Sequence, residues 1–62
     1  MLTGRETEIL KLISAGLISK QIADKLYISV NTVNTHRQLI LEKLNAENAI
    51  EAIKFAKKLG IL

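Results

Sequence analysis

The chain contains no cysteine, no proline and no tryptophan, and its 62 residues include one histidine, His36. Without cysteine there is no disulfide and no thiolate metal site, and one histidine cannot build a zinc centre by itself. Chains shorter than about 70–80 residues usually carry such a staple, because their hydrophobic core is small. We therefore expect stability to come from well-packed helices or from oligomerisation, with no metal and no other cofactor.

The small size also argues against an enzyme. A substrate pocket of about 300 Å³ or more would hollow out most of the core that so short a chain can form. His36 has neither a second histidine nor a nucleophile system that would support catalysis or metal binding. A packed, hydrogen-bonded histidine is the favoured interpretation.

Long apolar runs and strong charge are missing as well. No run approaches the ~18 residues of a membrane span, and the N-terminus lacks the basic and apolar regions of a signal peptide, so we expect a cytoplasmic protein. Nine Lys and Arg stand against six Asp and Glu, which gives a net charge of +3. Small basic domains often bind nucleic acid, although net charge alone is weak evidence.

The spacing of apolar residues predicts a compact all-α fold of four helices joined by short turns. Thr3 followed three residues later by Glu6 is typical of a capping box at the start of a helix. Gly16 suits a left-handed residue at the end of that helix. The other expected caps are Ser19, Ser29 and Asn48 at helix starts and Asn45 and Gly60 at helix ends. The expected helices cover residues 4–15, 20–26, 30–44 and 49–59.

The segment 30–44 has two chemically different faces. At about 100° per residue, Val33, Ile40 and Leu44 lie on one side together with Arg37. The opposite side carries Asn31, Asn34, Thr35, Gln38 and Glu42. Surface helices more often use Glu and Lys there, which have higher helix propensity. Asn and Gln can pair with adenine in the major groove of DNA, and Thr can contact a thymine methyl. The pattern favours base recognition over the alternative, a merely solvated face.

A short helix, a turn of about three residues and a longer helix are typical of a helix-turn-helix. Where the two helices cross, a small residue is needed, and Ala23 provides it. Ile28 in the turn and Val33 in the second helix supply apolar contacts. An ordinary helical hairpin that happens to contain an alanine is the simpler alternative.

The segment 49–59 is more apolar than a surface helix requires. Its apolar arc spans about 220° at 100° per residue, whereas a stripe a little over 100° wide covers a core. The excess indicates a second contact, namely a self-paired helix in a symmetric homodimer. Alanines that expose little area are the alternative explanation, and Lys57-Lys58 is too short a basic cluster for a membrane-surface helix. The expected dimer interface comprises Ile50, Ile53, Lys54 and Lys57.

Several separated motifs keep their spacing along nearly the whole chain: Leu2-Thr3-x-Arg5-Glu6, Gly16, Lys20-Gln21-Ile22-Ala23, Ile28-Ser29-x-x-Thr32-Val33-Asn34-x-His36 and Lys43-Leu44. In this arrangement the sequence resembles the LuxR-type (FixJ/NarL/GerE-like) helix-turn-helix domain. The resemblance implies a four-helix DNA-binding domain of bacterial transcription regulators, many of them two-component response regulators. It also implies a helix-turn-helix over about 19–38, a recognition helix at 30–44 and a dimer contact on 49–59.

Carried over position by position, the family's base-reading residues fall on Asn34, Thr35 and Gln38, which the helical projection also selects. Asn31 is a fourth candidate on the same face. The expected contacts to the DNA backbone are Lys20, Thr32, Arg37 and Lys43. Asn34 departs from the family pattern, in which a lysine is common, so the preferred bases should differ.

Two of these backbone contacts have alternatives. Lys20 lies at a helix start, where free N–H groups and the positive helix end favour a phosphate, but a first-turn lysine can also be simply solvated. Arg37 lies near the core side of its helix. Pairing within the protein, for example with Glu6, is as consistent with the sequence as a phosphate contact.

The sequence as a whole predicts that residues 1–62 are one domain that binds double-stranded DNA sequence-specifically in transcription regulation. The alternative is a protein–protein interaction module that uses the same fold without DNA. The motifs begin at Leu2 and leave no room for a regulatory domain, which we expect to be missing from this chain. The chain would then be either the output domain of a response regulator or a stand-alone small regulator.

Overall fold

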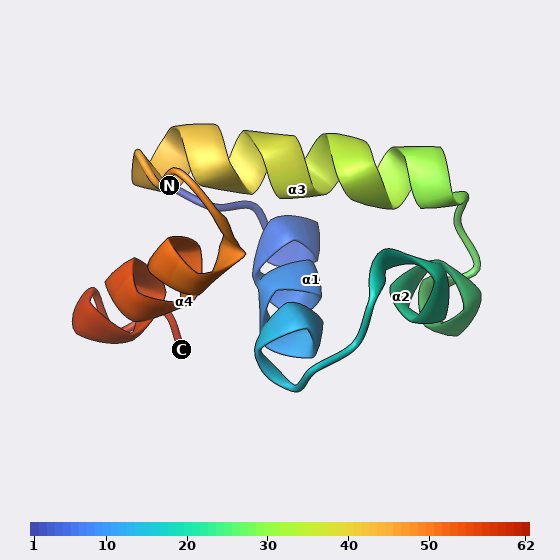
Figure 1. The fold of residues 1–62 in the computed structure, drawn as a ribbon, viewed down its shortest axis with the longest axis horizontal. Coiled ribbons are helices and arrows are strands. Elements are labelled where there is room, and N and C mark those ends of the chain that lie inside the picture. The colour runs from blue at the N-terminus through green and yellow to red at the C-terminus, as the bar shows by residue number, and fades with distance from the viewer.

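The computed structural model describes the whole chain, Met1–Leu62, as four helices without strands. The helices are α1 (Gly4–Ser14), α2 (Ser19–Leu26), α3 (Val30–Leu44) and α4 (Ala49–Lys58). Figure 1 shows α3 lying across the other three helices, with α1 between α2 and α4. The predicted all-α fold is confirmed, and the helix bounds differ from the expected ranges by at most one residue.

Side chains fix three of the four helix starts in the expected way. At α1, the Thr3 hydroxyl accepts from the Glu6 N–H at 3.1 Å, and the Glu6 carboxylate accepts from the Thr3 N–H at 2.8 Å. Ser29 before α3 and Asn48 before α4 each accept from the backbone N–H three residues later, at 3.0 and 2.9 Å. These bonds satisfy N–H groups that have no partner within the helix.

The start of α2 differs from the prediction. Ser19 is the first residue of the helix rather than its cap, and Ile18 occupies the capping position with an extended backbone. The isoleucine side chain has no acceptor, so this end is closed only by Gln21, whose Oε1 accepts from the Ile18 N–H at 3.0 Å. The prediction was wrong because the Ser19 hydroxyl is used elsewhere: it donates to Asn34 in α3.

A residue in the left-handed conformation closes every helix. It follows α2 and α3 directly, whereas one right-handed residue precedes it after α1 and α4. Gly16 (φ 96°), Asn45 (φ 53°) and Gly60 (φ 77°) adopt the conformation expected of them. Tyr27 ends α2 with φ 57°, which side chains other than those of Asn and Asp rarely adopt. The turn between α2 and α3 comprises only residues 27–29.

The core lies where α3 crosses the other helices, and all four helices contribute to it. Ala23 and Val33 are buried, and Ile28 in the turn packs against the same core, as the helix-turn-helix interpretation predicts. The buried apolar residues are Ile9, Leu10, Ile22, Ala23, Val33, Ile40, Ala52 and Ala56. This packing holds one face of α3 inward and leaves the opposite face free. None of the helices has the length and apolar character needed to cross a bilayer.

Candidate nucleic-acid interface

The outer face of α3 carries only uncharged side chains from Asn31 to Gln38. Val33 and Ile40 are 0% and 1% exposed on the inner face, whereas the side chains of the outer face are all exposed. The two faces predicted from the sequence are thus confirmed. The exposed polar residues are Asn31, Asn34, Thr35 and Gln38. They form what we call the polar face of α3.

The side chains of the polar face differ in what they already bind. The Asn34 amide oxygen accepts a hydrogen bond from the Ser19 hydroxyl at 2.8 Å. The Thr35 hydroxyl donates to the Asn31 carbonyl at 3.0 Å, so its donor is occupied within the helix. The amide groups of Gln38 and Asn31 make no side-chain hydrogen bond, which leaves their donors and acceptors free for a ligand.

The four residues predicted to contact the DNA backbone lie in different surroundings. Lys20 is exposed in the first turn of α2. The Thr32 hydroxyl lies 2.9 Å from that of Ser29 at the start of α3. Arg37 is half-buried and lines a small apolar hollow between α1, α3 and α4. Lys43, near the end of α3, is the only one of the four in an ion pair.

That ion pair joins Lys43 to Glu6 with an Nζ to Oε1 distance of 2.9 Å. Glu6 is 2% exposed and also carries the capping bond from Thr3. The hydrogen bonds from Lys43 and from the Thr3 N–H hold the pKa of the Glu6 carboxyl below its usual value, against burial, which raises it. The pairing of Glu6 with Arg37 that the sequence allowed is therefore wrong: Lys43 occupies the carboxylate.

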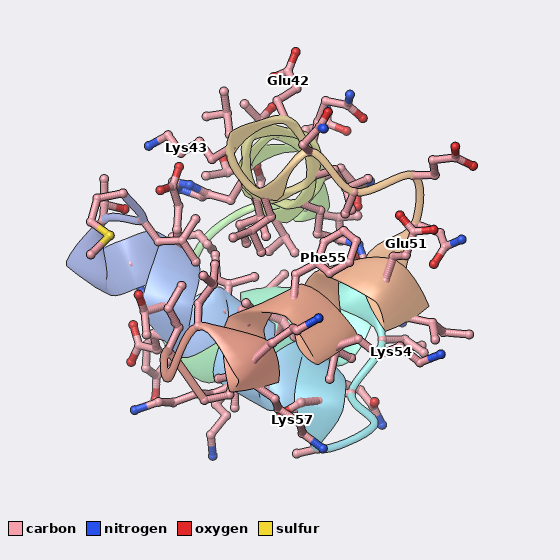
Figure 2. All side chains as sticks on the ribbon, turned by 90° about the vertical axis from the view of Figure 1, so that its left-hand side faces the viewer. Glu42, Lys43, Glu51, Lys54, Phe55 and Lys57 are labelled. Atoms are coloured by element: carbon pink, nitrogen blue, oxygen red, sulfur yellow. The ribbon has the colours of Figure 1, made fainter.

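The far end of α3 faces an acidic groove. It is an open depression between the end of α3 and the start of α4, and its acidic residues are Glu42, Glu47 and Glu51. Figure 2 shows Glu42 pointing away from α3 and Glu51 at the side of α4 that faces this end. Carboxylates repel phosphates. Phosphate is therefore disfavoured in this groove.

His36 is packed but not as expected. The residue is half-buried, and its Nδ1 atom is buried without a hydrogen-bond partner. The predicted hydrogen bond is thus missing at this nitrogen.

The outer side of α4 combines apolar and basic groups. Ile50 is 70% exposed, Ile53 is half-buried, and Lys54 and Lys57 are exposed. In Figure 2, Lys54 and Lys57 point away from α3, whereas Phe55 points toward its end. The exposed Ile50 has no partner within the chain that covers it, although it lies on a helix that packs its alanines inward.

A helix-turn-helix whose second helix exposes amides and hydroxyls has the geometry of a domain that enters the major groove of DNA. Comparison with known proteins agrees with this class. A family model described as bacterial regulatory proteins, luxR family, matches residues 1–56. The chain belongs to this family.

Individual relatives give the same result. The uncharacterized response regulatory protein YgeK of Escherichia coli (strain K12) is 48% identical over 60 residues, which cover 97% of this chain and 41% of YgeK. The oxygen regulatory protein NreC of Staphylococcus carnosus (strain TM300) is 44% identical over 62 residues, 100% of this chain and 29% of NreC. The structure of the response regulator ChrA from a heme-sensing two-component system matches with a TM-score of 0.95 and 40% identity, over 100% of this chain and 31% of ChrA.

This chain therefore spans less than half the length of these relatives. YgeK is a response regulatory protein, NreC an oxygen regulatory protein and ChrA a response regulator, and the part of each that this chain matches is its LuxR-type DNA-binding domain. DNA binding in transcription regulation, which the sequence predicts, is the function of this family.

Two features of the interface do not follow from the sequence. The sequence predicts Ser19 as a cap and does not indicate its bond to Asn34, because nothing in the spacing of the two residues suggests a contact. It predicts a DNA contact for Lys43 without indicating its partner Glu6. A buried glutamate in a capping box could have indicated the need for a cation, since buried charges are usually paired.

Proposed function

We propose that this chain binds double-stranded DNA with α3 in the major groove. The observation that supports this most directly is the polar face of α3, whose side chains are exposed opposite the buried Val33 and Ile40. A helix fits the major groove, where amide and hydroxyl groups can distinguish base pairs. The base-reading residues of the proposal are Asn31, Asn34, Thr35 and Gln38. No catalytic step is assigned to the chain.

The proposal places DNA phosphates against the residues beside this face. Lys20 and Thr32 lie at the starts of α2 and α3, where free N–H groups and the positive helix end favour an anion. Arg37 is half-buried and lines the apolar hollow, so a phosphate contact would have to be made by the guanidinium at the tip of its side chain. A phosphate contact of Lys43 requires its ammonium to share or leave the Glu6 carboxylate.

A second part of the proposal is a homodimer that pairs through α4, at least on DNA. It is supported by the exposed side chain of Ile50 and by Ile53, Lys54 and Lys57 around it. A net charge of +3 also provides few cations for tight binding by one copy. Two paired copies would read half-sites centred about 10 bp apart.

We further propose that the chain acts in the bacterial cytoplasm as the output domain of a response regulator, because YgeK and ChrA are response regulators. A genomic reading frame that encodes a receiver or sensor domain upstream of Met1 would support this role. A frame that starts at Met1 would support a stand-alone regulator instead.

Selection of bound duplexes from a random-sequence pool tests DNA binding directly. At low salt, we expect retarded complexes in a mobility-shift gel and enrichment of a common motif over successive rounds. The absence of any shift at low salt, together with a stable complex with another protein, would contradict the proposal and favour an interaction module.

A further inference from the structure

We propose that Ser19 is a positioning residue that sets which base Asn34 reads. This inference rests on the proposed binding of α3 to DNA and goes beyond it, because Ser19 itself is not among the base-reading residues. The role would explain why a serine hydroxyl at the first residue of α2 is turned toward α3 and not toward the backbone of its own helix.

The Ser19–Asn34 bond joins two helices that the core holds in place. The Ser19 hydroxyl donates to Oδ1 of Asn34 at 2.8 Å, across 15 positions of sequence. Ala23 in α2 and Val33 in α3 are buried at the crossing of these helices, so neither end of the bond is on a mobile loop. The bond is exposed, and it favours one orientation of the Asn34 side chain before any ligand arrives, which lowers the entropy lost on binding.

The direction of this bond decides which part of the amide is free. An asparagine side chain has one acceptor oxygen and one donor NH₂ group. Oδ1 has two lone pairs and the Ser19 hydroxyl takes one of them, whereas both hydrogens of the NH₂ group are free, so the NH₂ group is the part of Asn34 with most capacity left for a ligand. Bidentate pairing with adenine needs both the oxygen and the NH₂ group, whereas guanine presents two acceptors, N7 and O6, in the major groove. Asn34 is thus arranged as a donor for guanine.

Gln38 provides an internal comparison on the same face. Its side chain is exposed and makes no hydrogen bond within the chain, so both its oxygen and its NH₂ group are free. It can therefore pair with adenine in the bidentate manner. Two amides of similar chemistry are prepared for different bases because only one of them has a serine beside it.

The test is selection from a random-sequence duplex pool at low salt, followed by sequencing, for the unmodified chain and matched variants. Ser19→Ala removes the hydroxyl and Ser19→Thr keeps it. Asn34→Ala and the Ser19→Ala/Asn34→Ala double variant show whether Ser19 acts through Asn34. Ser14→Ala is the control, because Ser14 is another helical serine whose hydroxyl donates only to the Lys11 carbonyl, at 2.7 Å. Thermal unfolding by circular dichroism checks that each variant is folded.

We expect the unmodified chain to select guanine at one position, and this preference to disappear in Asn34→Ala. Ser19→Ala should shift that position toward adenine by about tenfold, the size of a modest base contact, and leave other positions unchanged. Ser19→Thr and Ser14→Ala should keep guanine, and Ser19→Ala should have no further effect on base choice in the Asn34→Ala background.

An unchanged preference in Ser19→Ala would overturn the inference, and so would an equal change in the Asn34→Ala background. In either case the enriched motif of the unmodified chain would leave the proposed DNA binding intact. If no duplex is retained by any variant, the proposed function fails together with the inference.

Discussion

The ammonium of Lys43, near the end of α3, lies 2.9 Å from the carboxylate of Glu6, in the first turn of α1, although 37 positions of sequence separate them. Glu6 is almost completely buried, and its carboxylate also accepts a hydrogen bond from the N–H of Thr3, the residue that caps α1. One carboxylate therefore caps α1 and ties α1 to the helix that carries the polar face. Removal of its charge should loosen both contacts.

Glu6→Gln should lower the free energy of unfolding by about 1–2 kcal/mol at pH 7, since the amide keeps an acceptor but loses the charge that strengthens both bonds. Urea unfolding followed by circular dichroism measures this. Glu8→Gln is the matched control, because Glu8 makes only an exposed pair with Arg5 at 3.3 Å. That change should stay within about 0.5 kcal/mol. Equal losses in both variants would contradict a special role for Glu6.

The same ion pair predicts an acid-sensitive component of stability. The pKa of Glu6 is lowered in the folded state, so the folded chain binds fewer protons at this group than the unfolded chain does. Its contribution to stability is complete well above the ordinary value of 4.5 and is lost as the pH falls through the lower, folded-state pKa. As the pH is lowered from about 6, the free energy of unfolding should fall less steeply in Glu6→Gln than in the unmodified chain. Parallel pH profiles would contradict this.

The missing side-chain cap of α2 offers a stabilising substitution. Ile18 has the extended backbone of a capping residue, is 63% exposed and provides no acceptor for the free N–H groups of the helix. Ile18→Ser should raise the free energy of unfolding by about 0.5–1 kcal/mol, because a serine cap satisfies one of those groups. Thermal unfolding measures the change. An unaltered or lower stability would show that the Gln21 bond already closes this end of α2.

The proposed dimer predicts a specific effect of charge at Ile50. Ile50→Asp should abolish a concentration-dependent monomer–dimer transition in sedimentation, since it places a carboxylate in the apolar contact. An acidic residue in the first turn of α4 suits the helix end, so the fold should survive. Ile18→Asp is the control, because it changes another exposed isoleucine, just before α2, and should leave the transition unchanged. A strictly monomeric unmodified chain, in solution and on DNA, would contradict the dimer.

Local features of the structure could be predicted from the sequence, and tertiary partners could not. The two faces of α3 follow from helical spacing alone, because Val33 and Ile40 lie seven positions apart on one side and Asn34, Thr35 and Gln38 fall on the other. The caps Thr3, Ser29 and Asn48 act on N–H groups within three residues, so their signals are local as well.

Contacts between helices depend on how the helices cross. The pairs Ser19–Asn34 and Glu6–Lys43 join distant parts of the chain, and no pattern in the sequence couples them. For this reason the sequence predicts Ser19 as a cap and Lys43 as a contact to the DNA backbone, without the partner that the structure gives to each. The helical projection predicts only that the side chains of the polar face are exposed. Their contacts with DNA are predicted from the chemistry of their amide and hydroxyl groups.

The most direct test compares base preference in two variants. It distinguishes recognition of the DNA sequence by α3 from electrostatic attraction to any DNA. Gln38 lies on the polar face without a bond inside the chain, whereas Lys20 lies at the start of α2. The measurement is the affinity of each variant for a panel of duplexes that differ from the selected site at one base pair, at several salt concentrations. Gln38→Ala should lose about 1–3 kcal/mol of discrimination at one position only. Lys20→Ala should weaken all duplexes alike and reduce the log–log salt slope by about 0.9. An equal loss for every duplex in Gln38→Ala, or affinities indifferent to salt, would contradict readout by α3.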